Sequence, residues 1–394
     1  MSNYQYHRIL PANARATYEE FNVVDYELTF PNRALVLGSV RLEGEVEVLV
    51  DGSKYLNDPR PSTITDAAAA AINCDDLRVQ MDGDCGAHAF VEVAQTQISG
   101  AVAESLGDYS RWVKMSACAM TAANDNNNSS NVCELKAPRD EITNNILKGE
   151  VVATDPDLST APTANGGLRQ NPDFSIKPRI CLNGGQGAVP FSRVGDVRVS
   201  FTLARNNSAL YGLNMGNKVE YKLRNLRLVY ATVPDDGSHS EKAVVMRKLN
   251  VKQSINSALA NVNVRVPAVC SAVSCSFNVQ AQENTPKYNN QVLHPVPNLS
   301  STQFLFNSST NAMVTYRIRS NAELIDRAID SFVDADKNNL STAKLANGDG
   351  MMLGLNFDDL VDLSRNAFSL ELDSSVSNLV PLVIYMYFHS QLEL

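Results

Sequence analysis

Alternation of apolar and polar residues is the clearest pattern along the chain, and it predicts β-strands. Because a strand turns successive side chains to opposite faces, an apolar residue at every second position predicts one buried face. A polar residue between each apolar pair is typical of half-buried strands in antiparallel sheets. The pattern recurs in four segments: Arg41–Val48, Val197–Leu203, Val314–Arg319 and Phe368–Leu372.

One longer segment, Val219–Tyr230, predicts a strand with an internal irregularity. Its apolar residues occupy odd positions up to Leu223 and even positions from Leu226 onward. A shift of one residue turns side chains to the opposite face, so we expect a bulge or bend near Arg224–Asn225. The strand is predicted to end at Thr232–Gly237 (TVPDDG), which is a strong turn signal.

The chain is long enough for two hydrophobic cores, and the turn after this strand separates two sets of predicted strands. We therefore expect an N-terminal arm over residues 1–20, a first sandwich over residues 21–236 and a second over residues 237–394. The second set includes a continuous apolar run, Leu382–Phe388 (LVIYMYF). Such a run predicts a strand that is covered on both faces.

Helical patterns are few. An apolar stripe predicts a helix over Asn321–Phe332, capped by its first residue, and shorter helices are expected at Phe357–Leu363 and around Tyr109–Met120. From about residue 118 to 190 the composition shifts to Asn, Pro and Gly, as in Asn124–Asn131 (NDNNNSSN). This composition predicts a long loop insertion that decorates one end of the first sandwich.

Charge and apolar runs exclude several classes of protein. The formal net charge is −9 and no basic run is longer than a pair, so we expect no direct nucleic-acid binding. The chain contains no stretch of 18 consecutive apolar residues, so no segment is predicted to span a bilayer. Residues Met1–Pro11 lack the apolar stretch of a secretory signal, and we therefore expect the chain to be made and folded in a cytoplasm.

Cysteine and histidine residues give little indication of a metal site. The seven cysteines are odd in number and show no C-x-x-C spacing, so we expect reduced thiols; a disulfide between Cys270 and Cys275 would need oxidising surroundings. The five histidines are scattered. Cys85 and His88 form a single ligand-like pair, which is more typical of a turn cysteine beside a strand histidine than of a metal centre.

Loop motifs give no catalytic or cofactor-binding residue either. Asn183–Gly187 (NGGQG) and Asn347–Gly350 (NGDG) lack the G-K-[ST] ending of a phosphate loop, and Asp82–Asp84 lacks the distal glutamate of a calcium loop. There is no G-x-S-x-G, and Trp112 is the only tryptophan available as a sugar platform. We therefore expect no enzyme and no cofactor, although two carboxylates on distant strands would be invisible to this reasoning.

Two segments resemble a known family. Gly86–Met115 reads as a strand over Ala87–Thr96, a turn near Ser99–Gly100 and a tyrosine-containing segment that leads into a helix. Gln303–Arg327 reads as an apolar strand, an Asn-rich turn and a strand that leads into another helix. Both are similar to segments of the double jelly-roll major capsid proteins, the lineage of adenovirus hexons and tailless, membrane-containing bacteriophages.

This resemblance implies a mostly β chain with two tandem eight-stranded jelly rolls that stand upright in an icosahedral shell. It implies a structural subunit without catalytic residues, which assembles as a homotrimeric, pseudo-hexagonal capsomer in the host cytoplasm and resides in the virion. Neighbouring capsomers and vertex or minor capsid proteins are its implied partners. Contact with an internal membrane is a further implication, although the N-terminal arm is neither markedly basic nor apolar. A viral spike or receptor-binding β-sandwich, and a β-sandwich hydrolase, are the alternatives.

Overall fold

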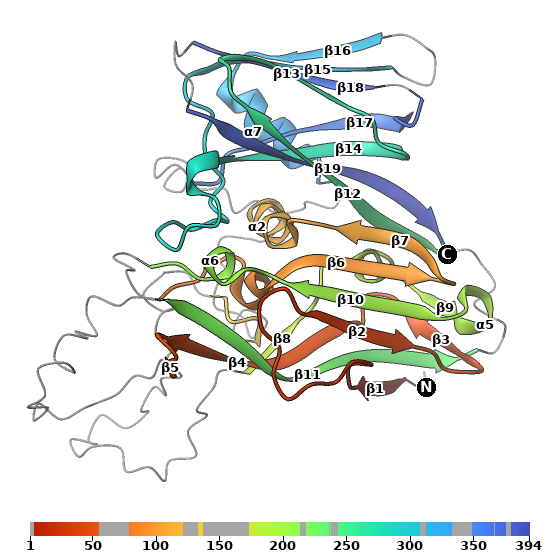
Figure 1. Cartoon of the computed structure of the whole chain (residues 1–394). Helices are drawn as coiled ribbons and strands as arrows, with labels where there is room; N and C mark the ends of the chain where they lie inside the picture. Colours follow the sequence, from red (N-terminus) through yellow and green to blue (C-terminus); the bar gives the residue numbers. More distant parts are fainter. Residues whose placement is uncertain are drawn as a thin grey trace, which may run out of the picture.

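The computed structural model describes residues 4–54, 79–120, 133–136, 173–212, 218–235, 237, 243–307, 313–332, 349–365, 367–375 and 380–394, and every structural statement below concerns these residues. Antiparallel strands dominate and form four sheets. The sheets pair into two sandwiches that lie side by side (Figure 1). Among the described residues, no helix has the length and apolar character needed to cross a bilayer.

The second sandwich has the strand order of a jelly roll. Its sheets are β12-β19-β14-β17 and β13-β18-β15-β16. Numbered within this sandwich, the strands run 1-8-3-6 in one sheet and 2-7-4-5 in the other. Chain neighbours therefore alternate between sheets, except for β15 and β16, which pair within one sheet. The strands are β12 (Val244–Ile255), β13 (Leu259–Val264), β14 (Val269–Val279), β15 (Leu299–Asn307), β16 (Met313–Ile318), β17 (Met352–Asp362), β18 (Phe368–Ser374) and β19 (Leu382–Glu393).

The first sandwich combines a four-stranded sheet, β2-β10-β6-β7, with a seven-stranded sheet. The larger sheet runs β5-β4-β11-β3-β9, with β1 paired to β11 and β8 paired to β4. The N-terminal arm therefore contributes a sheet strand. The strands are β1 (Gln5–Ile9), β2 (Val23–Leu28), β3 (Arg33–Val36), β4 (Arg41–Val50), β5 (Ser53–Lys54), β6 (Val91–Ile98), β7 (Ala101–Leu106), β8 (Asp173–Ile176), β9 (Ala188–Pro190), β10 (Val197–Leu203) and β11 (Val219–Pro234).

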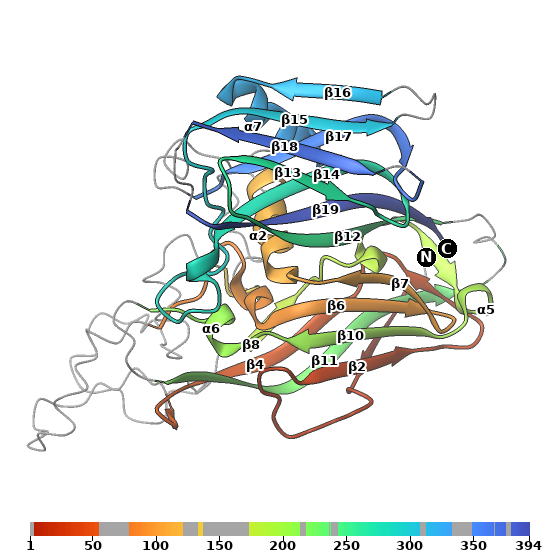
Figure 2. The same cartoon turned by 45° about the horizontal axis from the view of Figure 1, so that its top comes forward.

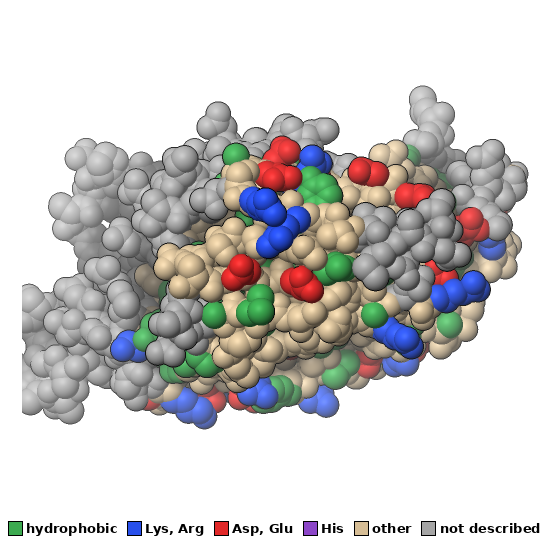
Figure 3. Space-filling model, turned by 90° about the horizontal axis from the view of Figure 1, so that it is seen from above, with side chains coloured by type: hydrophobic (Ala, Val, Ile, Leu, Met, Phe, Trp, Pro, Cys, Tyr) green, Lys and Arg blue, Asp and Glu red, His purple; other side chains and the backbone are tan. Residues whose placement is uncertain are grey.

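Alternating burial follows the alternating sequence pattern. In β18, Phe368, Leu370 and Leu372 are buried and pack in the core of the second sandwich. The intervening residues face outward, where Ser369 bonds to Asn261 and Asn263 of β13 at 2.8 and 2.7 Å. Figure 3 shows the second sandwich from above, a mostly polar surface with scattered charges. The prediction of half-buried antiparallel strands is confirmed.

The bulge predicted in β11 is also confirmed. The register of β11 against β4 shifts between Arg224 and Arg227, and Asn225 has a φ of +52°. This extra backbone length lets Leu223 and Leu226 both face the core although they are three residues apart.

Strand β19 is covered on both faces, as the apolar run predicted. It lies between β12 and β14, and every residue from Leu382 to Ser390 is buried. Ile384, Met386 and Phe388 enter the core of the second sandwich. Tyr385 and Tyr387 face the other way and join the core of the first sandwich. One strand thus belongs to the cores of both sandwiches.

The predicted helix at Phe357–Leu363 is wrong, because these residues lie in and just after strand β17. The strand carries a bulge opposite β14: Cys270 pairs with Val361, but Ala272 pairs with Asn356. Asp358 in the bulge has a φ of +57°. The bulge changes the phase of the buried residues, and the resulting spacing of Phe357 and Val361 imitates a helical stripe.

Helix α2 (Tyr109–Met120) is where the sequence predicted a helix. Helix α7 spans Asn321–Asp330, and its cap is Ser320, whose hydroxyl accepts a hydrogen bond from the Glu323 amide at 3.1 Å, so the predicted cap at Asn321 is wrong by one residue. The predicted strand at Ala87–Thr96 begins instead as the 3₁₀ turn η1 (Gly86–Phe90).

The predicted loop insertion over residues 118–190 is not all loop. Its final part forms β8, the 3₁₀ turn η3 (Cys181–Asn183) and β9, and Phe174, Ile176 and Ile180 are buried in the first core. Apolar residues spaced among Pro and Gly were too few to give a periodic signal. The Asn-rich stretch Asn124–Asn131 lies outside the described residues.

Candidate functional site: the junction of the two sandwiches

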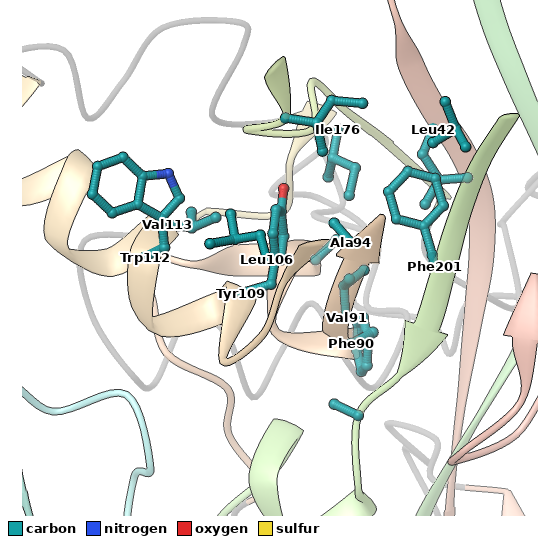
Figure 4. Close-up of a cluster of buried hydrophobic side chains, with 14 of the residues drawn as sticks. Leu42, Phe90, Val91, Ala94, Leu106, Tyr109, Trp112, Val113, Ile176 and Phe201 are labelled. Carbon is teal, nitrogen blue, oxygen red and sulfur yellow. The ribbon is translucent and has the colours of Figure 1, made fainter. Parts of the chain in front are cut away.

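Helix α2 lies where the two sandwiches meet, and its residues from Tyr109 to Ala119 are all buried. In Figure 4, Tyr109 and Val113 lie with Leu106 and Ala94 in the first core, whereas Trp112 lies at the far end of the cluster. The Trp112 ring contacts Phe332, Tyr387 and His389 of the second sandwich at centroid distances of 5.3, 5.3 and 5.4 Å. The helix therefore packs one apolar side against each sandwich.

Lys114 of α2 binds three carboxylates from both parts of the chain. Its ammonium lies 3.0 Å from Asp82 Oδ2, 2.8 Å from Asp84 Oδ2 and 2.9 Å from Asp349 Oδ2, with only 3% of its side chain exposed. Asp82 also accepts a hydrogen bond from Asn289 at 2.8 Å. Burial lowers the pKa of Lys114, but the three carboxylates outweigh it and hold the pKa well above its ordinary value.

Arg111, one turn earlier on α2, reaches into the second sandwich. It donates hydrogen bonds to the carbonyls of Val292 at 3.0 Å and of Asn290. Its guanidinium lies over the Tyr385 ring, 4.2 Å from the centroid. Burial lowers the pKa of Arg111, while nearby groups including Asp108 oppose the shift. The guanidinium thus has carbonyl acceptors for its N–H groups and an aromatic ring against its face. Arg111 is therefore a second polar residue, after Lys114, by which α2 binds the second sandwich.

Side chains also connect β7 to β12, the edge strands that face each other in Figure 1. Glu104 of β7 is 1% exposed, and its carboxylate accepts from the Lys248 amide at 2.7 Å and from the Cys181 amide at 2.5 Å. The Gly107 amide donates to Asn250 Oδ1 at 3.0 Å. These contacts replace the backbone ladder that two adjacent edge strands would otherwise form. Burial raises the pKa of Glu104, and the two amides oppose that shift.

A small polar cavity of about 40 Å³ lies beside Arg111 and contains Glu92, Asp108 and Glu283 in its walls. Paired carboxylates are what a β-sandwich hydrolase would need. This volume holds about one water molecule and no sugar or peptide substrate. Two of these acids instead pair with Lys252, whose ammonium lies 3.3 Å from Glu283 and 3.8 Å from Asp108. The charge of Lys252 also acts on Glu92.

Glu92 makes the stability of the junction pH-dependent. Burial, together with repulsion from Asp108, raises its pKa from 4.5 to about 7, against the opposing charges of Lys252, Arg205 and Arg111. The folded state therefore holds a proton that the unfolded state has lost, and stability falls as the pH rises from about 4.5 to about 7.

We expect Glu92→Gln to remove this loss. The variant should match the parent in urea unfolding at pH 4 and exceed its free energy of unfolding by up to about 3 kcal/mol at pH 8. Glu27→Gln, at an exposed position of β2, is the control and should show no such pH dependence. Equal stability of parent and Glu92→Gln at both pH values would contradict the prediction.

The residues singled out in the sequence are used structurally. The Cys85 thiol donates to the Ser110 carbonyl at 3.2 Å, and His88 Nδ1 bonds to the Tyr109 hydroxyl at 2.8 Å. Burial lowers the pKa of His88 to about 4, so its ring is neutral. Within the described part of the chain, no three His, Cys, Asp or Glu residues are grouped to hold a metal ion. Both Cys270 and Cys275 are free thiols.

All three rejected loop motifs have residues at this junction. Asp82 and Asp84, which resembled a calcium loop, bind Lys114 instead, and Asp349 of the NGDG turn joins them. In the NGGQG loop, a Cβ on Gly184 would lie 2.8 Å from the Met246 carbonyl oxygen, so glycine lets this loop pack against β12. Sequence reasoning missed the partners. The available signal was two cations, at 111 and 114, inside an otherwise apolar helix.

The fold has clear counterparts among solved structures. A Faustovirus major capsid protein matches with a TM-score of 0.59 at 9% identity, over 100% of this chain and 90% of that one. A chain of the PBCV-1 virus capsid matches with 0.55 at 12% identity, over 100% and 95%. The mavirus major capsid protein matches with 0.50 at 7% identity, over 98% and 86%. No protein-family model and no curated protein matches the sequence. The predicted double jelly-roll fold is confirmed.

Proposed function

We propose that this chain is the major structural subunit of an icosahedral virus shell. The observation that carries the proposal is the match of fold over nearly the whole length of this chain and of three viral capsid chains. A match that covers both sandwiches and their relative placement is more specific than a match to one jelly roll, a fold that serves many functions.

The junction supports this proposal because a shell subunit must hold its two sandwiches in one fixed arrangement. Lys114, Arg111 and Glu104 each join the two sandwiches through buried polar contacts. Such contacts are directional, so they fix the relative placement as well as the distance. Three copies of this rigid pair would present six sandwiches around a threefold axis, the outline of a pseudo-hexagonal capsomer.

A shell subunit of this kind would have a defined orientation, defined partners and a defined location. The strands would stand across the shell, and because both termini lie at the same end of the strands, both would face the same surface of the shell (Figures 1 and 2). The partners would be two further copies, neighbouring capsomers and vertex or minor capsid proteins, with peripheral contact to an internal membrane and none to the genome. The domains would span residues 21–236 and 237–394 after an arm of residues 1–20. The chain would have no enzymatic activity and would assemble in the host cytoplasm before it resides in the virion.

The purified chain is expected to form a stable trimer. Obligate interfaces bury about 2,000 Å² or more, and such a trimer survives dilution. Light scattering at micromolar concentration should give three times the chain mass of 42.9 kDa. A monomer with the same sheet content by circular dichroism would count heavily against a shell subunit.

Negative-stain images of the same material separate the shell subunit from a trimeric spike. Particles with a compact, near-sixfold outline are expected, since each copy supplies two sandwiches of similar size. Elongated particles with a threefold outline would support the spike reading instead.

A further inference from the structure

A cavity of about 300 Å³ lies at the junction, between the two sandwiches. Its walls come from β7, α2 and residues 177–186 of the first sandwich, and from β12, β19 and Phe332 of the second. The NGGQG loop, packed against β12, forms part of one wall. This volume is several times that of a water molecule and falls at the lower limit of small-molecule sites.

Three cations line this cavity: Lys177, Arg179 and Lys248. Neither Lys177 nor Arg179 forms an ion pair with a carboxylate of the described residues. The nearby carboxylate of Glu134 binds Lys136 at 2.8 Å and lies 3.4 Å from His88 Nε2. From Lys177 it accepts only the backbone amide, at 3.2 Å. Burial and the repulsion of Arg179 and Arg41 lower the pKa of Lys177, and the charge of Glu134 only partly opposes this shift. Positive charge thus accumulates on one side of the cavity.

The described lining residues carry three cations but only one carboxylate. Glu104 is the one carboxylate among the described lining residues, and both its oxygens accept backbone amides. His389 bonds to Ser274 at 2.9 Å, and burial with the nearby Lys248 keeps its pKa well below the usual value, so its ring is neutral. Gly185 and Gln186 also line the cavity, and their amides have no acceptor among the described residues.

We propose that this cavity binds a phosphate group, carried by a small soluble anion or by a lipid headgroup. A doubly charged tetrahedral oxyanion would offset the repulsion between Lys177 and Arg179 and accept hydrogen bonds from lysine, guanidinium and loop amides together. Because the walls belong to both sandwiches, the bound anion would tie them together and stabilise the folded chain. This site does not depend on the proposed shell function.

Titration calorimetry with inorganic phosphate at pH 7, with chloride used to match ionic strength, tests the proposal. One site per chain is expected in the parent, and at least tenfold weaker binding in the double variant Lys177→Gln/Arg179→Gln. The matched control is Arg317→Gln/Arg365→Gln, which removes two exposed cations from the distant part of the second sandwich and should bind like the parent.

Thermal unfolding of the same three proteins checks that the effect is local. Phosphate should raise the unfolding temperature of the parent and of the control along a curve that saturates with concentration. The unfolding temperature of the double variant should rise less. Equal shifts in all three proteins would be the general effect of a salt excluded from protein surfaces, and would overturn the proposal. Absence of calorimetric binding to the parent, together with no vesicle binding, would overturn it as well.

Vesicle sedimentation distinguishes the two sources of phosphate. Binding to vesicles of phosphatidic acid in phosphatidylcholine, weakened in Lys177→Gln/Arg179→Gln but not in the control, would assign the site to a lipid headgroup. Calorimetric binding of inorganic phosphate without vesicle binding would assign it to a soluble anion.

Discussion

A chain that ends at Asn378 is expected to lose the folded second sandwich. The truncation removes β19, which pairs with β12 along its full length and with β14 from Leu382 to Ser390. Seven buried apolar residues, at roughly 1.5–3 kcal/mol each, contribute on the order of 10 kcal/mol, comparable with the net stability of a whole domain. We expect aggregated protein, or soluble protein whose second half is cleaved rapidly in limited proteolysis.

The first sandwich should be affected as well, because Tyr385 and Tyr387 of β19 pack in its core. The control is a chain that lacks only Glu393 and Leu394, which keeps the whole buried part of β19 and should resist proteolysis like the parent. If the chain ending at Asn378 remained folded and trimeric, the assignment of β19 as a central strand would have to be abandoned.

Replacement of Lys114 by methionine is expected to lower the free energy of unfolding by about 3–5 kcal/mol, the usual cost of removing one partner from a buried ion pair. Methionine has similar length, so the loss arises from the carboxylates of Asp82, Asp84 and Asp349, which would face each other without a cation. Urea unfolding followed by tryptophan fluorescence measures the effect, because Trp112 lies two residues away on the same helix.

Two further variants make this result specific. Lys222→Met removes the ammonium that pairs with Glu19 at 3.1 Å on the surface, and should cost no more than about 1 kcal/mol. Asp349→Asn in the Lys114→Met background should recover part of the loss, since one fewer negative charge is buried. A Lys114→Met chain as stable as the Lys222→Met chain would show that the cluster does not hold the sandwiches together.

The sequence predicted those features that depend on local periodicity. The strand Arg41–Val48, the bulge near Asn225 and the doubly covered run Leu382–Phe388 all follow from which neighbouring positions are apolar. Periodicity predicted the wrong element at Phe357–Leu363, because a bulge interrupts strand β17 there. The bulge leaves two buried residues four positions apart, a spacing that a helix would also give.

The junction could not be predicted, because its partners are brought together only by the tertiary fold. Asp82 and Asp349 lie in turns that look ordinary in sequence, and nothing local pairs either with Lys114. The cavity between the sandwiches has the same origin: Lys177 and Lys248 line one cavity only because β12 packs beside the NGGQG loop. Cations that are brought together in this way have no periodic signature in the sequence.

The position of β19 has a consequence for the order of folding during synthesis. Every other strand of the second sandwich leaves the ribosome before β19. Because β19 lies between β12 and β14, this sheet is complete only after Leu382–Glu393 has emerged. The first sandwich, whose strands all lie before residue 235, can form much earlier. It then offers the α2 surface on which the outer face of β19 settles. A chain released too early would therefore carry a first sandwich whose α2 surface is still uncovered, together with an open second sheet. Its exposed strand edges would distinguish it from a complete chain before it joined an assembly.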